Sequence, residues 1–265
     1  MKNVIGFCLP QEDASTSLTP PTESAVSVPV RSVVEVYFPE NGRTYPYYND
    51  LYDLRTGDVV FVSGKLAGKL GVVKSVTTRF KVDLSVYKKV IARPDFRLGG
   101  TFRPLAGMMV SCGGSATPDA ALFRTWVRPP LPDAPAGEIV CGEGYSFDLS
   151  RLEQSEDLTP GVISKAIDYC NEGRVRYLSL QGGVGTAFVE GSVWYEVNFR
   201  CSAGQVTDMY CECPYPGLCK HNLAVLLILR TLLDELHMSD TSDFIAIEQG
   251  FFRRILSISK QEVTV

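Results

Sequence analysis

The sequence predicts an α+β protein that is mostly β: a small N-terminal β-barrel, followed by an α+β unit with a β-hairpin and a helix. Short β-branched and aromatic runs, separated by glycine turns, fill residues 32–92. Residues 158–173 and 221–236 carry the apolar spacing that is typical of helices. Hydrophobic residues make up 45% of the chain and charged residues 21%, which is an ordinary composition for a globular protein.

Changes in composition divide the chain into four parts. Residues 1–31 are predicted to form an irregular N-terminal arm, because 11–30 are rich in Ser, Thr, Pro and acids. Residues 32–126 are predicted to form the barrel-like domain with an irregular extension. The segment 127–140, which contains "VRPPLPDAPAG", has the proline content of a linker. Residues 141–265 are then the second domain.

The barrel is predicted from strands that follow one another closely. The first two, "VVEVYF" (33–38) and "RTYPYY" (43–48), are joined through an Asn-Gly turn. Further strands are expected in "LRTGDVVFV" (54–62), "GVVKSV" (71–76) and "VYKKVIA" (86–92). Many short strands with glycine turns are typical of a small closed barrel.

The stretch "GDVVFVSGKLAGKLGVVKSV" (57–76) resembles a KOW motif. That family is a strand–glycine loop–strand element of SH3-like barrels in ribosomal proteins and transcription factors, so the resemblance implies an SH3-like barrel here. Three glycines permit the tight turns, and Lys65 and Lys69 belong to the loop. The alternative is a barrel whose turns need glycine and whose lysines only face solvent.

The second domain begins with a well-marked helix. In "LTPGVISKAIDYCNEG" (158–173), Thr159 is suited to the N-cap, Pro160 to the first helical position and Gly173 to the stop. The next strands are "VRYLSL", "TAFVEG", "VWYEVNFRC" and "QVTDMYCEC", with "GGVG" (182–185) as a hairpin turn. Residues 221–236 form a buried helix, 243–258 include a short helix, and "EVTV" ends the chain as a strand. Residues 93–140 show no regular period, and Met108 and Met109 are expected in a core.

One short segment, "CECPYPGLCKH" (211–221), predicts a metal site. On a strand, residues i and i+2 face the same side, so Cys211 and Cys213 can present both sulfurs to one point. "PYPG" reverses the chain, and Cys219 and His221 then approach from the start of the helix. Three thiolates and one imidazole complete the tetrahedral shell of a structural Zn²⁺ site, and soft ligands disfavour calcium and magnesium.

A disulfide, an iron–sulfur cluster and a catalytic pair are each less consistent with the spacing of this segment. A disulfide between Cys211 and Cys213 would close a small strained ring. An iron–sulfur cluster would need a fourth cysteine, and Cys201 lies ten residues upstream. A catalytic Cys–His pair would lack an orienting acid and an oxyanion motif.

The metal-binding segment and its surroundings resemble the SWIM zinc finger. The match covers residues 186–236: two strands, the pattern C-x-C-x-n-C-x-H, and an apolar helix directly after the histidine. The resemblance implies that Cys211, Cys213, Cys219 and His221 are zinc ligands and that the module binds DNA or proteins. SWIM modules often accompany chromatin-remodelling-type helicases, and this chain carries no phosphate-loop motif of its own.

The remaining cysteines and the hydropathy indicate a cytoplasmic protein. Five cysteines are scattered singly, as small buried hydrophobes rather than as a disulfide framework: Cys8, Cys112, Cys141, Cys170 and Cys201. The longest apolar block, 223–229, is too short for a membrane span, and the first residues lack a secretory signal. No membrane partner is therefore expected.

Charge is distributed unevenly and leaves three function classes open. Residues 55–103 carry eleven basic and three acidic residues, a net +8, although the whole chain is −4. Such asymmetry favours a polyanion, or a basic module docked on an acidic one. We predict nucleic-acid binding, DNA or RNA, through Lys65, Lys69 and Lys88, with nearby tyrosines able to stack on unpaired bases: Tyr37, Tyr45, Tyr47, Tyr48 and Tyr52.

The alternatives to nucleic-acid binding are a protein-interaction adaptor, working with a helicase encoded elsewhere, and an enzyme. The chain has two histidines, and one is a predicted zinc ligand, so His237 is the one imidazole left for catalysis. It is better suited to a helix end than to an active site. The sequence therefore predicts a non-enzymatic protein and leaves its oligomeric state open.

Overall fold

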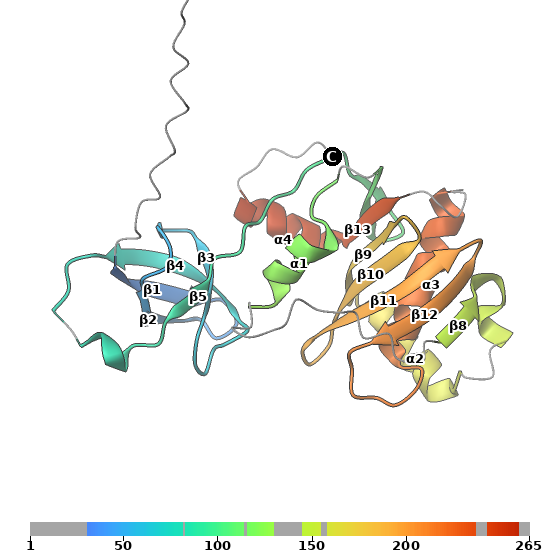
Figure 1. The fold of residues 1–265 in the computed structure, drawn as a ribbon, viewed down its shortest axis with the longest axis horizontal. Helices are drawn as coiled ribbons and strands as arrows, with labels where there is room; N and C mark the ends of the chain where they lie inside the picture. The colour runs from blue at the N-terminus through green and yellow to red at the C-terminus, as the bar shows by residue number, and fades with distance from the viewer. Residues whose placement is uncertain are drawn as a thin grey trace, which may run out of the picture.

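The structure is a computed structural model that describes residues 31–81, 83–113, 116–129, 145–154, 158–236 and 243–259. Strands make up 40% and helices 28% of these residues, which confirms the prediction of a mostly β protein. The strands form a five-stranded sheet and an eight-stranded sheet (Figure 1). The predicted arm (1–31) and linker (127–140) lie almost entirely outside the described residues, as do His237 and the predicted final strand.

The five-stranded sheet has the order β2-β1-β4-β3-β5. Its strands are β1 (Ser32–Phe38), β2 (Arg43–Asn49), β3 (Val59–Val62), β4 (Leu70–Thr77) and β5 (Val90–Ala92). The sheet curls until β2 meets the residue directly before β5, at one bridge between Tyr48 and Lys89. The segment predicted as one strand over 86–92 contains a 3₁₀ turn, Leu84–Val86, before β5.

Alternating side chains of β1 fill the inside of this curled sheet. Val34, Val36 and Phe38 are buried there with residues of β2, β3 and β4. Gly71 has to be glycine, because a Cβ at this position would lie 2.2 Å from a Val36 methyl group. The predicted glycine turn at Gly42 is confirmed by its left-handed backbone, with φ of +66°.

The eight-stranded sheet has the order β6-β7-β13-β9-β10-β11-β12-β8. Its strands are β6 (Arg103–Leu105), β7 (Met108–Cys112), β8 (Tyr145–Asp148), β9 (Val175–Gln181), β10 (Val184–Glu190), β11 (Trp194–Ser202), β12 (Gln205–Cys211) and β13 (Phe244–Glu248). A short 3₁₀ segment, Leu149–Gln154, follows β8. Each adjacent pair in this order is antiparallel.

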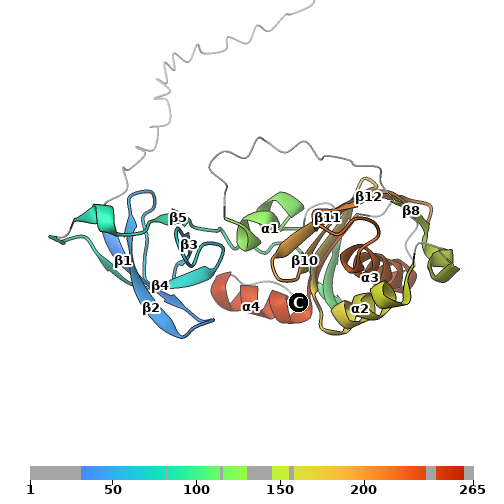
Figure 2. The same ribbon diagram turned by 90° about the horizontal axis from the view of Figure 1, so that it is seen from below.

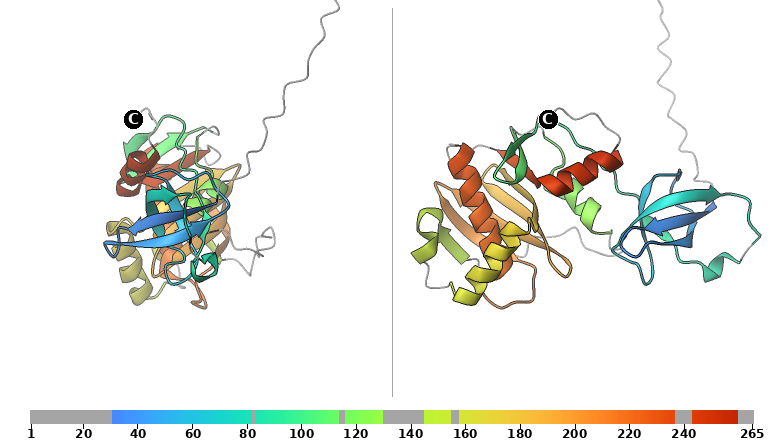
Figure 3. Two further views of the ribbon diagram at one scale, coloured as in Figure 1. Left: turned by 90° about the vertical axis from the view of Figure 1, so that its left-hand side faces the viewer. Right: turned by 180° about the vertical axis from the view of Figure 1, so that it is seen from behind.

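Two pairs of helices cover the faces of the larger sheet. On one face lie α2 (Pro160–Asn171) and α3 (Lys220–Leu236), which Figure 3 shows from behind. On the other lie α1 (Ala120–Val127) and α4 (Gln249–Ser259), next to the five-stranded sheet (Figure 2). Val59 of the smaller sheet joins their core, so the two sheets share a hydrophobic cluster.

The sequence groups residues 93–126 with the barrel, and the structure places part of them elsewhere. β6 and β7 belong to the larger sheet, because β7 pairs with β13 from Phe244↔Cys112 to Glu248↔Met108. The helix α1 packs on the same sheet. Met108 and Met109 are buried, as predicted, and face opposite sides of the sheet. The strand β13 is also new, since only a helix is predicted over 243–258.

The helix α2 confirms its predicted signals. Thr159 caps it and its hydroxyl oxygen accepts a hydrogen bond from Val162 N–H, Pro160 is the first helical residue, and Gly173 has a left-handed backbone after the helix. Val162 and Ala166 are buried, whereas Ile167 is 45% exposed. The helix α3 is buried along most of its length, as predicted, and lies between α2 and the sheet.

Phe123 of α1 is the centre of the aromatic cluster beneath α1 and α4. Its ring contacts five others, those of Tyr177, Phe188, Trp126, Trp194 and Phe251, at centroid distances of 4.5–6.4 Å. We expect Phe123→Ala to lower the free energy of unfolding by about 3–5 kcal/mol, because it leaves a large cavity. Urea unfolding followed by tryptophan fluorescence measures this, since both tryptophans lie in the cluster.

The control for this prediction is Leu51→Ala, which truncates a side chain that is 53% exposed. We expect it to change the free energy of unfolding by less than about 0.5 kcal/mol. Equal effects of the two substitutions would contradict the central role of Phe123.

Candidate metal centre

The first predicted ligand is delivered by a β-hairpin. The strands β11 and β12 pair in antiparallel register from Ser202↔Gln205 to Val197↔Cys211, so Cys211 is the last residue of β12. The turn between them uses left-handed residues at Ala203 and Gly204, with φ of +51° and +71°. The hairpin thus places Cys211 at the edge of the sheet where α3 begins.

The loop that follows returns the chain to α3. Cys213 is half-buried in this loop. Pro214 follows it directly, and Pro216 comes two positions after Pro214. Gly217 has φ of +107°, a backbone conformation that favours glycine, which confirms the predicted tight return. The loop ends at Cys219, which is 2% exposed.

Cys219 also caps α3. Its Sγ accepts a hydrogen bond from Asn222 N–H at 3.4 Å, and its carbonyl accepts one from Leu223 N–H at 3.2 Å. A thiolate at a helix N-terminus is stabilised by the backbone N–H groups and the helix dipole. His221, the second residue of α3, lies one position inside this cap. One side chain therefore serves both the helix and the predicted metal.

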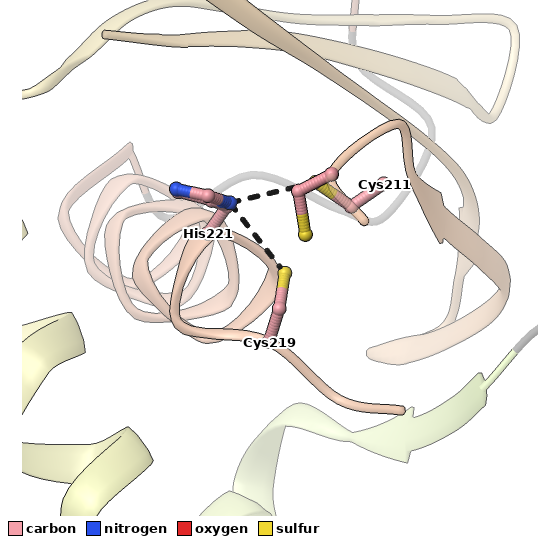
Figure 4. Close-up of side chains that lie close together, drawn as sticks. Cys211, Cys219 and His221 are labelled. Carbon is pink, nitrogen blue, oxygen red and sulfur yellow. Dashed lines mark hydrogen bonds between the residues drawn. The ribbon is translucent and has the colours of Figure 1, made fainter. Parts of the chain in front are cut away.

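The structure brings all four predicted ligands together. One ligand atom from each of Cys211, Cys213, Cys219 and His221 lies within 4.8 Å of all the others. His221 Nδ1 is 3.7 Å from Cys211 Sγ and 3.7 Å from Cys219 Sγ (Figure 4). All of these cysteines are free thiols, and Cys201 lies in the core on β11 instead.

These distances match those of a tetrahedral zinc site. Bonds of about 2.3 Å to sulfur and 2.0 Å to nitrogen give ligand–ligand separations of roughly 3.5–3.8 Å. The two nitrogen–sulfur distances of 3.7 Å fall in this range, and all four ligand atoms lie within 4.8 Å of one another. The residues present therefore fit a metal ion with a preference for sulfur and nitrogen.

The thiols already differ in acidity within the cluster. The pKa of Cys219 is lowered to about 4, because its sulfur accepts hydrogen bonds from the Cys211 thiol, from His221 and from Asn222 N–H. The pKa of Cys211 is raised, because its thiol donates to Cys219 and is buried. Burial also raises the pKa of Cys213. A cation would stabilise all three thiolates at once.

Aromatic rings hold the imidazole of His221 in place. The ring of Tyr195 stacks on it at a centroid distance of 4.4 Å, and Tyr169 lies at 5.4 Å. His221 is 4% exposed. Its second nitrogen, Nε2, is buried and has no hydrogen-bond partner among the described residues, and Figure 4 shows it pointing away from the sulfurs.

A charged network supports the loop from the opposite side of β11. Arg124 of α1 donates two hydrogen bonds to the buried carboxylate of Glu196, at 2.9 and 2.6 Å. Arg128 forms ion pairs with Glu196 and with Glu212, the residue between Cys211 and Cys213. Glu212 N–H donates to the Glu196 carbonyl, and the Glu212 carboxylate accepts from Glu196 N–H. The network links α1 to the metal-binding loop.

The sequence did not predict this network, because its members come from α1, β11 and the loop. Its one sequence signal was the acidic residue at position 212, inside the C-x-C motif. The hydrogen bonds that Arg124 donates to Glu196 raise the pKa of the Arg124 guanidinium further above its ordinary value.

The three predicted nucleic-acid contacts lie on the five-stranded sheet. Lys65, Lys69 and Lys88 are all exposed. Lys69 forms an ion pair with Glu40, whereas Lys65 and Lys88 have none with the described residues. The methylene groups of Lys88 lie over Gly64, beside the backbone that carries Lys65. Of the three, Lys65 and Lys88 are therefore the better candidates.

Lys88 belongs to a groove that we call the tyrosine groove. It has a volume of about 340 Å³ and is lined by Tyr45, Pro46, Tyr47, Val86, Tyr87 and Lys88. Tyr45 and Tyr47 are among the tyrosines that the sequence predicts to stack on bases, but Tyr47 is 6% exposed and belongs to the core of the five-stranded sheet. Tyr87, which the 3₁₀ turn brings to the groove, is not among them. Tyr48 is buried and forms a bridge with Lys89, directly before β5, and Tyr52 donates a hydrogen bond to the Ile91 carbonyl, so these two have structural roles.

Comparisons with protein-family models, with curated proteins and with solved structures found no match to this chain. None of the helices in the described residues is both long and apolar enough to cross a membrane. The function is therefore inferred from the chemistry and geometry of the residues themselves.

The charged network yields a stability prediction. We expect Arg124→Ala to lower the free energy of unfolding by about 1–3 kcal/mol, because it removes two charge-assisted hydrogen bonds and leaves the Glu196 carboxylate buried with a weaker partner. Urea unfolding measures the change. Arg200→Ala is the control, since its pair with Asp208 is solvent-exposed and should contribute about 0–1 kcal/mol. A loss no greater than that of the control would contradict the structural role of Arg124.

Proposed function

We propose that residues 186–236 form a SWIM-type zinc finger in which Cys211, Cys213, Cys219 and His221 hold one Zn²⁺. The observation that carries this proposal is the convergence of three sulfurs and one imidazole nitrogen within 4.8 Å, the donor set of a closed tetrahedral zinc site. When bound, the ion supplies the positive charge that keeps all three thiols ionised. Four ligands leave no open position, so the proposed role is structural and not catalytic.

The metal proposal predicts about one zinc per chain. We expect Cys213→Ser and His221→Ala to lose most of the metal, whereas Cys112→Ser, which changes an exposed thiol on β7, should retain it. Elemental analysis of the purified proteins measures the zinc content. Hydrogen exchange should become faster in α3 than in β1–β4 when zinc is removed, because metal binding is coupled to local folding. Absence of zinc from the parent protein would rule out the site.

We further propose that the five-stranded sheet is an SH3-like barrel that binds nucleic acid through the tyrosine groove and the adjacent lysines. The net charge of +8 over residues 55–103 supports an anionic partner. The groove supports unpaired bases in particular, because tyrosine rings stack on any base while a lysine contacts the phosphate backbone. Single-stranded DNA or RNA is therefore the proposed ligand class, and double-stranded forms are expected to bind more weakly.

This proposal predicts salt-sensitive binding that depends on two lysines. The double variant Lys65→Glu/Lys88→Glu should weaken binding to single-stranded oligonucleotides at least tenfold at low salt, because it replaces two phosphate contacts by repulsion. Lys69→Glu should weaken binding less than Lys65→Glu or Lys88→Glu alone, since Lys69 already pairs with Glu40. Fluorescence titration with labelled oligonucleotides at two salt concentrations measures both.

The matched control is Arg200→Glu/Arg253→Glu, which makes the same change of net charge at two exposed positions outside the five-stranded sheet. It should retain most of the affinity. Equal losses in the two double variants would show that binding follows total charge rather than the groove. If the parent protein binds no oligonucleotide at low salt, the protein-adaptor function replaces this proposal, with the lysines facing an acidic protein surface.

A further inference from the structure

A cavity of about 360 Å³ beside the metal centre makes one of its cysteines accessible. Cys213 and Cys219 are both among the residues that line this cavity. Cys219 is 2% exposed, whereas Cys213 is half-buried and the loop residues that follow it, 214–217, are exposed. A solute as small as hydrogen peroxide therefore has room to reach the sulfur of Cys213.

The sulfur of Cys219 lies close enough to react with an oxidised Cys213. All the ligand atoms of the cluster lie within 4.8 Å of one another, and a disulfide bond is about 2.0 Å long. Cys219 is held in place, because its Sγ accepts a hydrogen bond from Asn222 N–H and its neighbour Leu218 is buried in the core. The remaining gap is therefore closed by Cys213, which lies in the exposed loop and outside the helices and strands.

The positions of the three cysteines select this pair. Cys211 and Cys213 are separated by one residue, so a disulfide between them would close a small strained ring. Cys211 and Cys219 are both held by regular structure, at the end of β12 and at the cap of α3. Five residues separate Cys213 from Cys219, and Gly217 among them has φ of +107°, so this loop is able to bend.

We propose that Cys213 and Cys219 form a redox switch, in which hydrogen peroxide converts their two thiols into a disulfide. The Cys213 sulfur first attacks one peroxide oxygen: an S–O bond forms, the O–O bond breaks, and the other oxygen leaves as water with the thiol proton. The Cys219 sulfur then attacks the Cys213 sulfur, an S–S bond forms, and the S–O bond breaks to release a second water. The two thiols together lose two electrons and two protons, which reduce one peroxide to two waters.

The disulfide disables the metal centre. The thiolate is the form of cysteine that binds a metal, so oxidation leaves Cys211 and His221 as the remaining ligands. The cap of α3 also changes, because the sulfur that accepts from Asn222 N–H becomes a disulfide sulfur. A thiol reductant restores both cysteines, so the switch is reversible. The loss of metal rests on the proposed zinc site, whereas formation of the disulfide rests on the positions of the sulfurs.

Peroxide treatment of the zinc-loaded full-length protein tests the inference. Free thiols are then alkylated in denaturant, and mass spectrometry examines the tryptic peptide 201–220, which carries Cys201, Cys211, Cys213 and Cys219. We expect a disulfide that joins Cys213 and Cys219, with Cys201 and Cys211 alkylated. A colorimetric chelator added to the same samples should detect about one zinc released per disulfide. A thiol reductant with added zinc should reverse both changes.

Two variants serve as controls. Cys112→Ser removes an exposed thiol on β7 and should respond to peroxide like the parent. Cys213→His keeps four side chains that bind zinc but removes the attacking sulfur. We therefore expect its zinc loss in peroxide to be at least about tenfold slower than that of the parent.

Disulfide mapping of the parent decides the outcome, whether or not Cys213→His binds zinc. Reduced Cys213 and Cys219 after Cys112 has been oxidised, a disulfide to another cysteine, or a sulfinic acid at Cys213 would each overturn the inference. Zinc content keeps the two proposals separate. A parent that carries no zinc but forms this disulfide would contradict the metal site alone, and a parent that carries zinc but forms no such disulfide would contradict the switch alone.

Discussion

Three cysteine sulfurs and one imidazole nitrogen meet where β12 ends and α3 begins, and the surrounding structure depends on their staying together. The loop between them is short and rich in turn residues, and Leu218 is its one residue in the hydrophobic core. The four side chains are further fixed points of this loop. Since Cys219 also caps α3 through Asn222 N–H, displacement of this one sulfur would release both the loop and the first turn of the helix. The helix in turn covers much of one face of the larger sheet.

Contacts on the opposite face of the larger sheet also hold the metal-binding loop in position. Glu196 on β11 is buried beneath Arg124 of α1 and Arg128, the residue directly after α1, and it exchanges backbone and side-chain hydrogen bonds with Glu212. Glu212 stands between two of the cysteines, so the position of the C-x-C segment is determined from α1 as well as from α3. Truncating one arginine leaves the buried Glu196 carboxylate with fewer partners, whereas removing a ligand releases the loop. The metal centre is thus coupled to both layers of helices rather than attached to the edge of the fold.

The parts that sequence reasoning predicted are those with local signals. The cap, the first-turn proline and the stop of α2 lie within fifteen residues, and the cysteine spacing similarly describes one short segment. The missed parts are non-local. β13 reads "FIAIE", with four of its five residues buried on both faces, and such a run lacks the alternation that identifies a strand. Its partners, β7 and β9, are about 135 and 65 residues away in sequence. The network of Arg124, Glu196 and Glu212 arises only after this sheet has formed.

The number of unpaired charges is also a feature that the sequence predicts only in part, and it bears on function. The sequence counts every basic residue in 55–103 equally, but the structure neutralises several of them through ion pairs, including Lys69 with Glu40, Lys89 with Asp50 and Arg93 with Asp58. Unpaired positive charge remains beside the tyrosine groove, at Lys65 and Lys88.

The tyrosine groove and the metal centre lie on different parts of the molecule, because the groove belongs to the five-stranded sheet while the metal centre lies where β12 ends and α3 begins. The helices α1 and α4 lie between the two sheets (Figure 2). The proposed nucleic-acid site and the proposed metal site therefore share no side chain, so a substitution in one leaves the residues of the other unchanged.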